Sequence, residues 1–209
     1  MLLHLVPLIV FVLLLLQAKR AVKDPLLIRL VKGLRLRHLA LSLLSLFSMA
    51  LAGAVLLLPN TLLRWGWWSA LGGKGNVIFA QSASTAGSKT GVIFALVIIV
   101  LLSITLGHAA LNEEIMFREG DEHRTLSERI KRSVVFGLAH LIMGIPIGAA
   151  LALSSGGFVF SHAYVRQYRR TGSRGLSLIE ATRVHLLSNM LVIFIVTLYI
   201  LSQMAHLWK

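Results

Sequence analysis

The stretch GVIFALVIIVLLSITLGHAALNEE, residues 91–114, decides how this sequence folds. Its first 21 residues are predominantly apolar, which is enough for one helical crossing of a bilayer core about 30 Å thick. Two adjacent glutamates, Glu113 and Glu114, follow directly. The chain has only eight acidic residues, and five of them fall between residues 112 and 124. Negative charge is thus concentrated where a membrane-spanning helix is expected to end.

The composition of the whole chain is that of a membrane protein. Hydrophobic residues make up 56% of the sequence and the mean hydropathy is +0.80, with several apolar runs of nearly twenty residues. Long alternation of polar and apolar residues, the pattern of a transmembrane β-barrel, is absent. The sequence contains no cysteine, which excludes disulfides, thiol nucleophiles and Cys-ligated metals. We expect an all-α, polytopic membrane bundle whose surroundings are lipid.

Six segments are expected to span the membrane. They are residues 2–16, 39–58, 91–111, 133–150, 151–168 and 185–205. The first is expected to stay as an uncleaved helix, because it lacks a basic start and a small-residue cleavage site. Residues 1–90 are predicted to hold N-terminal transmembrane helices, a basic interfacial segment and an external loop. Residues 91–209 are predicted to form a helical core.

The net charge of +13 raises the question of a nucleic-acid partner, but the basic residues lie between the predicted spans. Membrane insertion alone places positive residues in cytoplasmic loops, so no nucleic-acid partner is expected. Segments 17–38, 112–132 and 164–184 hold 17 of the 21 Lys and Arg residues. If these segments share the cytoplasmic side, the N-terminus lies outside and residues 133–168 form a hairpin. We expect a multi-pass protein of a bacterial-type inner membrane.

Three further segments are expected outside the bilayer core. Residues 24–39 space basic side chains at helical intervals among leucines, as in a basic helix lying on the membrane surface. Residues 64–73 cluster three tryptophans, as in an aromatic belt at the membrane interface. Residues 81–91 form a polar stretch that reads as an external loop.

Three pairs of residues are spaced four apart, so that each pair shares one face of a helix. They are Glu114 with Arg118, Phe136 with His140, and His185 with Asn189. In the predicted topology all three stand at the cytoplasmic ends of helices. Glu preceding Arg at this spacing favours an ion pair, which lowers the cost of charge near a membrane. Glu113 points about 100° away around the helix and is free for another task.

A carboxylate and an imidazole shielded from water can activate a water molecule, because desolvation brings a carboxyl pKa toward neutrality. A separate His/Asn pair can donate hydrogen bonds to an oxyanion. Taken singly, each pair has an ordinary structural role, as a helix cap or as polar contact between helices. The three pairs together favour a hydrolase of peptide bonds. Their acidic neighbours Glu119, Asp121 and Glu122 are expected to begin a solvated loop, or else to guide a basic substrate tail.

The ordered motifs Glu113-Glu114-x-x-x-Arg118, Phe136-x-x-x-His140 and His185-x-x-x-Asn189 resemble those of the CPBP family. These intramembrane proteases, also called Abi or type II CAAX-prenyl endopeptidases, include bacteriocin self-immunity proteins. The stretch YRRTGSRGLSLIEATRVHLLSN, residues 168–189, resembles the family's link between the second and third motifs. The resemblance covers residues 91 to about 205. Each motif is weak alone, and the ordered set is fairly specific.

The resemblance implies a role for each matching residue. Glu113 with His140 would activate the attacking water, and His185 with Asn189 would hold the oxyanion. Glu114 and Arg118 would orient the site, and Phe136 would pack beside His140. The implied chemistry needs no cofactor, and the lack of an HExxH motif agrees with that. Zinc is the alternative, with Glu113, His140 and His185 as its ligands. The compact chain favours a membrane-tethered peptide or protein as substrate over a prenylated CAAX peptide.

Two other functions stay open on the sequence. A non-catalytic immunity or scaffold protein of the same fold would bind a partner peptide. A small transporter or proton channel would use Glu113, His108 and His140 as a relay, although these residues cluster at one face instead of crossing the bilayer. His108 is expected to form a hydrogen bond within the bundle. Structural or solvated roles are expected for His4, His38, His123, His162 and His206.

Overall fold

The computed structural model describes residues 2–73, 76–79 and 88–207, and its regular structure is entirely helical within this part of the chain. The α-helices are α1 (Leu2–Ala21), α2 (Leu26–Lys32), α3 (Leu36–Leu57), α4 (Trp67–Ala70), α6 (Lys89–Arg118), α7 (Leu126–Ala139), α8 (Ile147–Thr171) and α9 (Arg174–Leu207). Three 3-10 helices lie in connections: η1 (Leu62–Arg64), η2 (Asp121–His123) and η3 (His140–Met143). The predicted all-α fold class is confirmed. Most of the predicted loop at 81–91 and the side chains of His4 and His206 lie outside the described residues.

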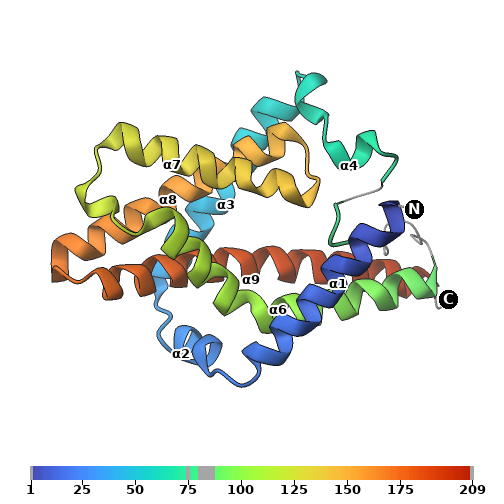
Figure 1. Ribbon diagram of the computed structural model, residues 1–209, viewed down its shortest axis with the longest axis horizontal. Coiled ribbons are helices and arrows are strands. Elements are labelled where there is room, and N and C mark those ends of the chain that lie inside the picture. The colour runs from blue at the N-terminus through green and yellow to red at the C-terminus, as the bar shows by residue number, and fades with distance from the viewer. Residues whose placement is uncertain (1, 74–75, 80–87, 208–209) are drawn as a thin grey trace.

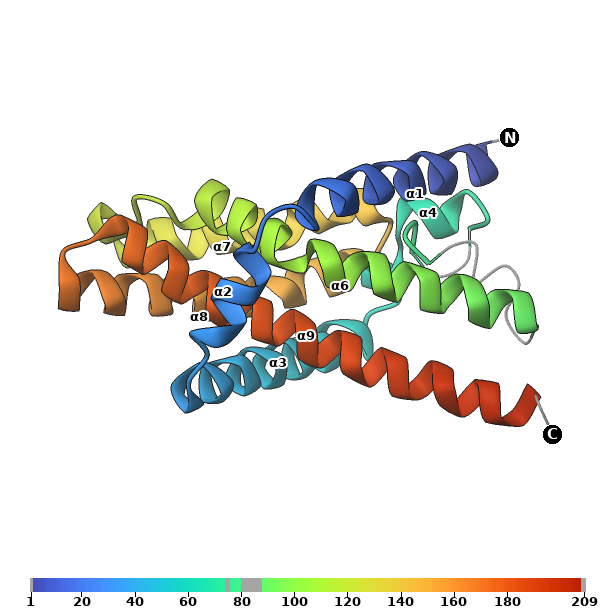
Figure 2. The same ribbon diagram turned by 90° about the horizontal axis from the view of Figure 1, so that it is seen from below.

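The helices are arranged around α9, which runs along the length of the molecule (Figure 1). Helices α3, α6 and α8 each pack against α9, while α1 packs on α6 and α7 packs on α8. Figure 2 shows α6 and α9 diverging toward the start of α6 and the end of α9. The C-terminal part of α6 and the N-terminal part of α9 lie in the opposite half, where α7 and α8 cover them.

The number of candidate membrane spans is smaller than expected. Among the described residues, three helical segments are long and apolar enough to cross a membrane: Leu36–Leu57, Lys89–His123 and Arg174–Ser202. A fourth results if Leu5–Ala21 and Leu26–Lys32 count as one broken span, with a bend of 71° between its parts. The helices are compatible with a multi-pass membrane protein of three or four spans. The predicted count of six is not confirmed.

The predicted spans 133–150 and 151–168 are not among these candidates. Helix α7 has 14 residues, which gives about 21 Å of helix, too little for a core about 30 Å thick. Helix α8 has 25 residues, but its last turns carry Arg166, Arg169 and Arg170. The predicted hairpin is present, since α7 and α8 pack together, but the boundary at residue 150 is wrong. The chain reverses before Ile147, through Gly144 at φ 74° and Pro146.

The prediction of one surface helix over residues 24–39 is also wrong. Helix α2 ends at Lys32 and α3 begins at Leu36. His38 is fully buried, with its Nε2 at 3.1 Å from Oε1 of Glu180. Arg37 donates a hydrogen bond of 2.9 Å to the other oxygen of Glu180. Glu180 lies in α9. These contacts therefore join α3 to α9, which hydropathy could not show because the partners are far apart in sequence.

Two of the tryptophans at residues 64–73 contact the rest of the protein. Trp68 in α4 is buried against Val77, and Nε1 of Trp67 donates to the carbonyl of Leu141 at 2.6 Å. Trp65 is exposed, and its carbonyl accepts a hydrogen bond from the backbone of Ile147. These contacts hold the segment against the turn between α7 and α8.

The three basic segments come together in space. Figure 1 places the end of α1 with α2, the connection between α6 and α7, and the connection between α8 and α9 in one half of the molecule. These segments hold 17 of the 21 basic residues.

Candidate active site

Three helices bring their ionisable side chains to one place. Glu113 and Glu114 lie near the end of α6, and His140 follows the last residue of α7 as its C-cap. His185 lies eleven residues after Arg174, about 16 Å along α9. The predicted span 133–150, which would place His140 inside a helix, is therefore wrong. Because α7 begins at Leu126 and ends at Ala139, His140 stands where the chain leaves the helix.

One oxygen of Glu113 faces two histidines. Its Oε2 lies 3.6 Å from Nε2 of His185 and 3.9 Å from Nε2 of His140. This oxygen is buried and has no hydrogen-bond partner in the described part of the chain. The side chains of Glu113 and His140 are 33% and 27% exposed, whereas His185 is 4% exposed. The three groups are too far apart for direct hydrogen bonds and close enough for one water molecule to bridge them.

The other nitrogen of each imidazole has its own partner. Nδ1 of His140 lies 2.9 Å from the carbonyl oxygen of Phe136, which can only accept, so Nδ1 carries the proton. Nδ1 of His185 lies 2.9 Å from Oε1 of Glu114, and an ionised carboxylate likewise requires the ring to donate. In the neutral form both rings therefore present the lone pair of Nε2 toward Glu113.

Aromatic side chains fix the plane of both rings. Phe160 of α8 stacks on His185 with ring centroids 4.4 Å apart and planes 17° apart. Phe136 meets His140 and His185 edge-on, at centroid distances of 4.9 and 5.6 Å. The packing of Phe136 beside His140 is present as the resemblance implied. Phe160 was not foreseen, because the stretch GGFVFSHAY offers no spacing that distinguishes a site residue from a core residue.

Glu114 and Arg118 form the buried base of the cluster. Both side chains are fully buried, and Nε of Arg118 lies 3.8 Å from Oε2 of Glu114. The guanidinium carbon lies 4.8 Å from the centroid of Phe136. An added methyl group on Gly157 of α8 would lie 2.7 Å from Nη2 of Arg118 and from Cδ1 of Phe136. Close approach of α8 to the cluster therefore requires a residue without a side chain at this position.

Asn189 lies one turn beyond His185 on α9, partly buried. Its side-chain amide makes no hydrogen bond to any described residue, so its donors and its acceptor are available to a ligand. His108, the third member of the alternative relay, is bound elsewhere: its Nε2 lies 3.0 Å from Oδ2 of Asp24. This contact is the hydrogen bond within the bundle that the sequence predicted for His108.

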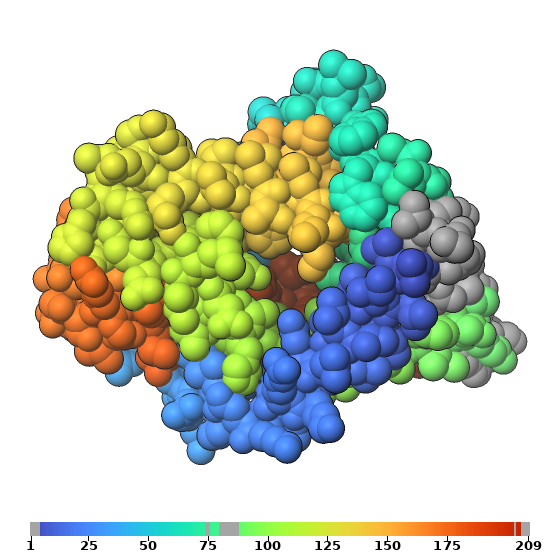
Figure 3. Space-filling model, in the orientation of Figure 1, coloured from blue at the N-terminus to red at the C-terminus, as the bar shows by residue number. Residues whose placement is uncertain are grey.

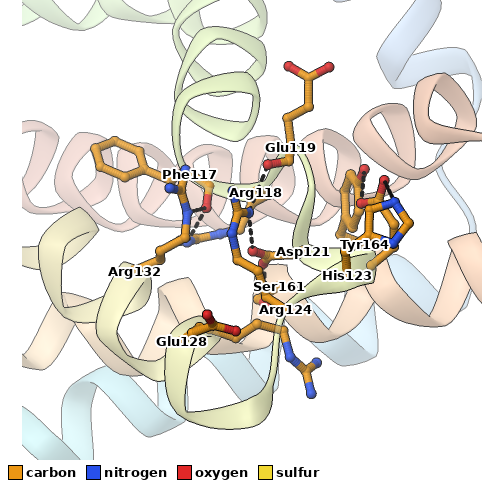
Figure 4. Close-up of polar contacts among 12 residues, drawn as sticks. Phe117, Arg118, Glu119, Asp121, His123, Arg124, Glu128, Arg132, Ser161 and Tyr164 are labelled. Carbon is orange, nitrogen blue, oxygen red and sulfur yellow. Dashed lines mark hydrogen bonds and ion pairs between the residues drawn. The ribbon is translucent and has the colours of Figure 1, made fainter.

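The prediction of a solvated loop start is wrong for two of the three acids after Arg118. Asp121 is 1% exposed and accepts hydrogen bonds from Ser161 at 2.6 Å and from Arg124 at 2.8 Å (Figure 4). The Glu122 side chain is also buried and accepts from Tyr164 of α8 and from Arg174 of α9. Glu119 alone is exposed. These contacts join the end of α6 to α8 and α9, so Asp121 and Glu122 are structural ties.

The remaining histidines with described side chains have ordinary surroundings. His123 is exposed and lies 3.1 Å from Nη2 of Arg174, and His38 is the buried partner of Glu180. His162 is exposed on α8.

The molecule is hollowed beside the helices that carry the cluster. Figure 3 shows a depression bordered by α1 and by the turn between α7 and α8, with α9 visible at its base. His140 belongs to the chain at this turn, and His185 to α9. The partial exposure of Glu113 and His140 is consistent with access from this face.

Zinc was the alternative cofactor, with Glu113, His140 and His185 as ligands. Both histidines have the outer partner on Nδ1 that metal-bound imidazoles usually have. However, no group of three or more His, Asp or Glu side chains in the described part of the chain is arranged to hold a metal ion. The proposed mechanism contains no step through a metal.

The fold and the site define an all-helical protein with membrane-spanning candidates and a partly buried glutamate–histidine cluster. No protein-family model matches this sequence, and comparisons with curated proteins and with solved structures give no match. The function is therefore argued from the residues of this chain.

Proposed function

We propose that this protein is an intramembrane endopeptidase that hydrolyses a peptide bond of a membrane-associated peptide or protein. The observation that carries the proposal is the position of Glu113 Oε2. This oxygen is buried without a hydrogen-bond partner, and it faces the Nε2 atoms of His185 and His140 at 3.6 and 3.9 Å. A carboxylate that faces two imidazoles is the minimum equipment for activating a water molecule.

In the proposed reaction, Glu113 is the general base. It takes a proton from the water as the water oxygen bonds to the carbonyl carbon, and Nε2 of His140 orients the same water. The proton then passes from Glu113 to the amide nitrogen, the carbon–nitrogen bond breaks, and an acid and an amine leave. Atoms and charge balance without any further reactant.

His185 and Asn189 are proposed to hold the oxyanion of the tetrahedral intermediate. Since Nδ1 of His185 donates to Glu114, Nε2 can donate to an oxyanion only when the ring carries two protons. Glu114 holds Nδ1 of His185 so that Nε2 points toward Glu113, and Nε of Arg118 lies 3.8 Å from the other oxygen of Glu114. Asn189 contributes an amide donor that no described residue occupies.

The substrate is proposed to be tethered to the membrane, because the cluster lies on two of the candidate spans, α6 and α9. The grouping of basic residues supports a site toward the cytoplasm of a bacterial-type cell, by the positive-inside rule. Membrane lipid is the surrounding partner, and nothing in the proposed reaction calls for a nucleic acid.

The test compares peptide termini in membranes of cells that carry the wild-type protein, Glu113→Gln or Glu119→Gln. Glu119 is an exposed acid near the same helix end, which makes Glu119→Gln the matched control. We expect termini that appear with the wild type and the control and that decrease by roughly a factor of 10²–10⁴ with Glu113→Gln. His140→Ala and His185→Ala should give the same loss in protein that is inserted and abundant.

Full activity in Glu113→Gln would end the assignment of the catalytic base. If no terminus differed among inserted proteins and the cellular phenotype persisted in Glu113→Gln, the non-catalytic immunity or scaffold function would replace the protease.

A second measurement concerns the metal. After dialysis of purified protein against a strong zinc chelator, we expect peptide hydrolysis to continue at the same rate, because no step of the proposed mechanism uses a metal. Loss of activity that added zinc restores would show that Glu113, His140 and His185 close around an ion during the reaction.

A further inference from the structure

A basic pocket lies between α7 and α8, away from the glutamate–histidine cluster. It has a volume of about 440 Å³ and is lined by Arg129, His162, Val165, Arg166, Arg169 and Arg170. Arg129 comes from α7, and the other five residues come from the last part of α8. His162, Arg166 and Arg169 or Arg170 follow at intervals of three and four, so they share one face of α8. Four guanidinium groups therefore line one pocket.

The protein supplies no counter-charge to this pocket. All eight acidic residues of the chain lie in the described part, and none forms an ion pair with any of the four arginines. Their carboxylates have other surroundings: Asp24 with Arg29 and His108, Glu113 and Glu114 in the cluster, Glu119 in solvent, Asp121 with Arg124, Glu122 with Arg174, Glu128 at Thr125, and Glu180 with Arg37 and His38. The four positive charges of the pocket are therefore available to an anion from outside.

The interior of the pocket points to a ligand as well. Nε of Arg129 is buried and has no hydrogen-bond partner among the described residues. Val165 is only 7% exposed, whereas Arg166, Arg169 and Arg170 are exposed. A buried donor without an acceptor costs free energy unless a ligand or water supplies one. The residues that line the pocket therefore combine a buried donor without a partner with three exposed positive charges.

We propose that this pocket binds a phosphate group, either the headgroup of an acidic phospholipid or a free phosphate. Guanidinium groups match phosphate oxygens with paired hydrogen bonds and stay charged at any physiological pH. Basic pockets between helices at a membrane surface are suited to acidic lipid headgroups. The last lining residue, Arg170, lies near the end of α8, and α9, a candidate span, begins four residues later at Arg174.

This site is separate from the proposed catalytic cluster. Arg129 and His140 are eleven positions apart along the chain, which corresponds to about 16 Å of helix. Binding at the pocket can therefore be measured whether or not the protein hydrolyses peptides. Its failure would leave the proposed protease activity untouched.

The test uses the full-length protein purified in a neutral detergent. Native mass spectrometry counts bound phosphatidylglycerol against phosphatidylcholine, and equilibrium dialysis measures inorganic phosphate. The variant Arg166→Gln/Arg169→Gln/Arg170→Gln removes three charges from the pocket. The matched control Lys19→Gln/Arg20→Gln/Lys23→Gln removes three charges from exposed positions without ion pairs in the described part. Both variants thus carry the same net charge.

We expect the wild type and the control to retain one phosphatidylglycerol in preference to phosphatidylcholine. The pocket variant should bind it roughly a hundredfold more weakly, at about a factor of five for each arginine removed. Arg169→Gln alone should weaken binding by about fivefold and serves if the triple variant does not fold. If the wild type binds inorganic phosphate and the same variants lose this binding, free phosphate is a ligand. If the wild type does not bind inorganic phosphate, the ligand is the lipid headgroup.

Equal losses in the pocket variant and in the control would overturn the proposal, because attraction by the overall charge would then explain the binding. Failure of the wild type to prefer phosphatidylglycerol, together with no binding of inorganic phosphate, would also overturn it.

Discussion

The glutamate–histidine cluster and the basic pocket differ in whether their charged side chains have partners within the protein. In the cluster, each glutamate lies within 4 Å of an imidazole or guanidinium group, supplied by His140, His185 and Arg118. In the pocket, four arginines lie together without any acid. Burying a charge costs free energy unless a partner takes the place of water. The cluster can therefore be shielded from solvent, whereas the pocket must stay accessible to solvent. A cluster whose acids have partners within the protein suits catalysis. A pocket whose arginines have no acidic partner suits the binding of an anion.

The largest expected effect on stability comes from unbalancing the cluster. Glu114→Gln leaves Arg118 charged and fully buried without its ion-pair partner, which should lower the free energy of unfolding by about 3 kcal/mol. Arg170→Gln is the matched control, because it removes an exposed charge without a partner and should leave stability unchanged. Denaturant unfolding of both proteins in the same detergent measures the difference. Equal stability of the two variants would contradict the contrast between the regions.

A smaller effect is expected from the packing around the cluster. Gly157→Ala places a methyl group 2.7 Å from Arg118 and Phe136, which forces both to move and should cost about 1–3 kcal/mol. Gly175→Ala is the control, because no atom lies within 4 Å of a methyl group there. Hydrolysis should fall in the first variant and persist in the second. An active, fully stable Gly157→Ala protein would show that α8 can retreat without disturbing the cluster.

The smallest effect concerns an acid outside both regions. Glu128 accepts hydrogen bonds from the backbone and the hydroxyl of Thr125 at the start of α7, and these bonds hold its carboxyl pKa below the usual value. A lowered pKa means that the stabilisation is present above the unfolded-state value and disappears as the pH falls through the folded-state value. The wild type should therefore lose a small part of its thermal stability on acidification. Glu128→Gln keeps an acceptor but does not titrate, so it should lack this part of the acid response.

An identical acid response in wild type and Glu128→Gln would show that the cap contributes nothing that depends on charge. Effects of charge on stability would then be confined to the glutamate–histidine cluster and the basic pocket.

Much of the fold followed from the sequence. Apolar runs placed α3, α6 and α9, because a membrane-spanning helix satisfies its own backbone hydrogen bonds and needs only length and hydropathy. The same criterion misplaced the division between α7 and α8. The turn lies at Gly144 and Pro146, whereas the predicted boundary between the two spans was residue 150. Hydropathy could not separate a span from a helix that packs inside the protein.

The candidate site was predicted in its members but not in all its contacts. The spacing of Glu114 with Arg118 and of His185 with Asn189 is a property of one helix each, which sequence can show. The stacking of Phe160 on His185 and the hydrogen bond from His185 to Glu114 join residues on different helices. No local pattern encodes such pairs.

The acids at residues 119–122 illustrate the same division. In the sequence they form a single charged run at the end of an apolar helix. The structure buries Asp121 and Glu122 against α8 and α9 and leaves Glu119 in solvent. The difference depends on which neighbours supply donors, and those neighbours lie some forty to fifty positions further along the chain.

The sequence by itself determined that this protein is helical, is compatible with a membrane and carries three polar pairs, since hydropathy and helical spacing are local properties of the chain. Only the tertiary structure decided which charges are neutralised and which are not. Ion pairs depend on distances of a few ångströms between segments remote in sequence, and packing alone fixes those distances. In that packing, both histidines face Glu113, and four arginines lie together without an acidic partner.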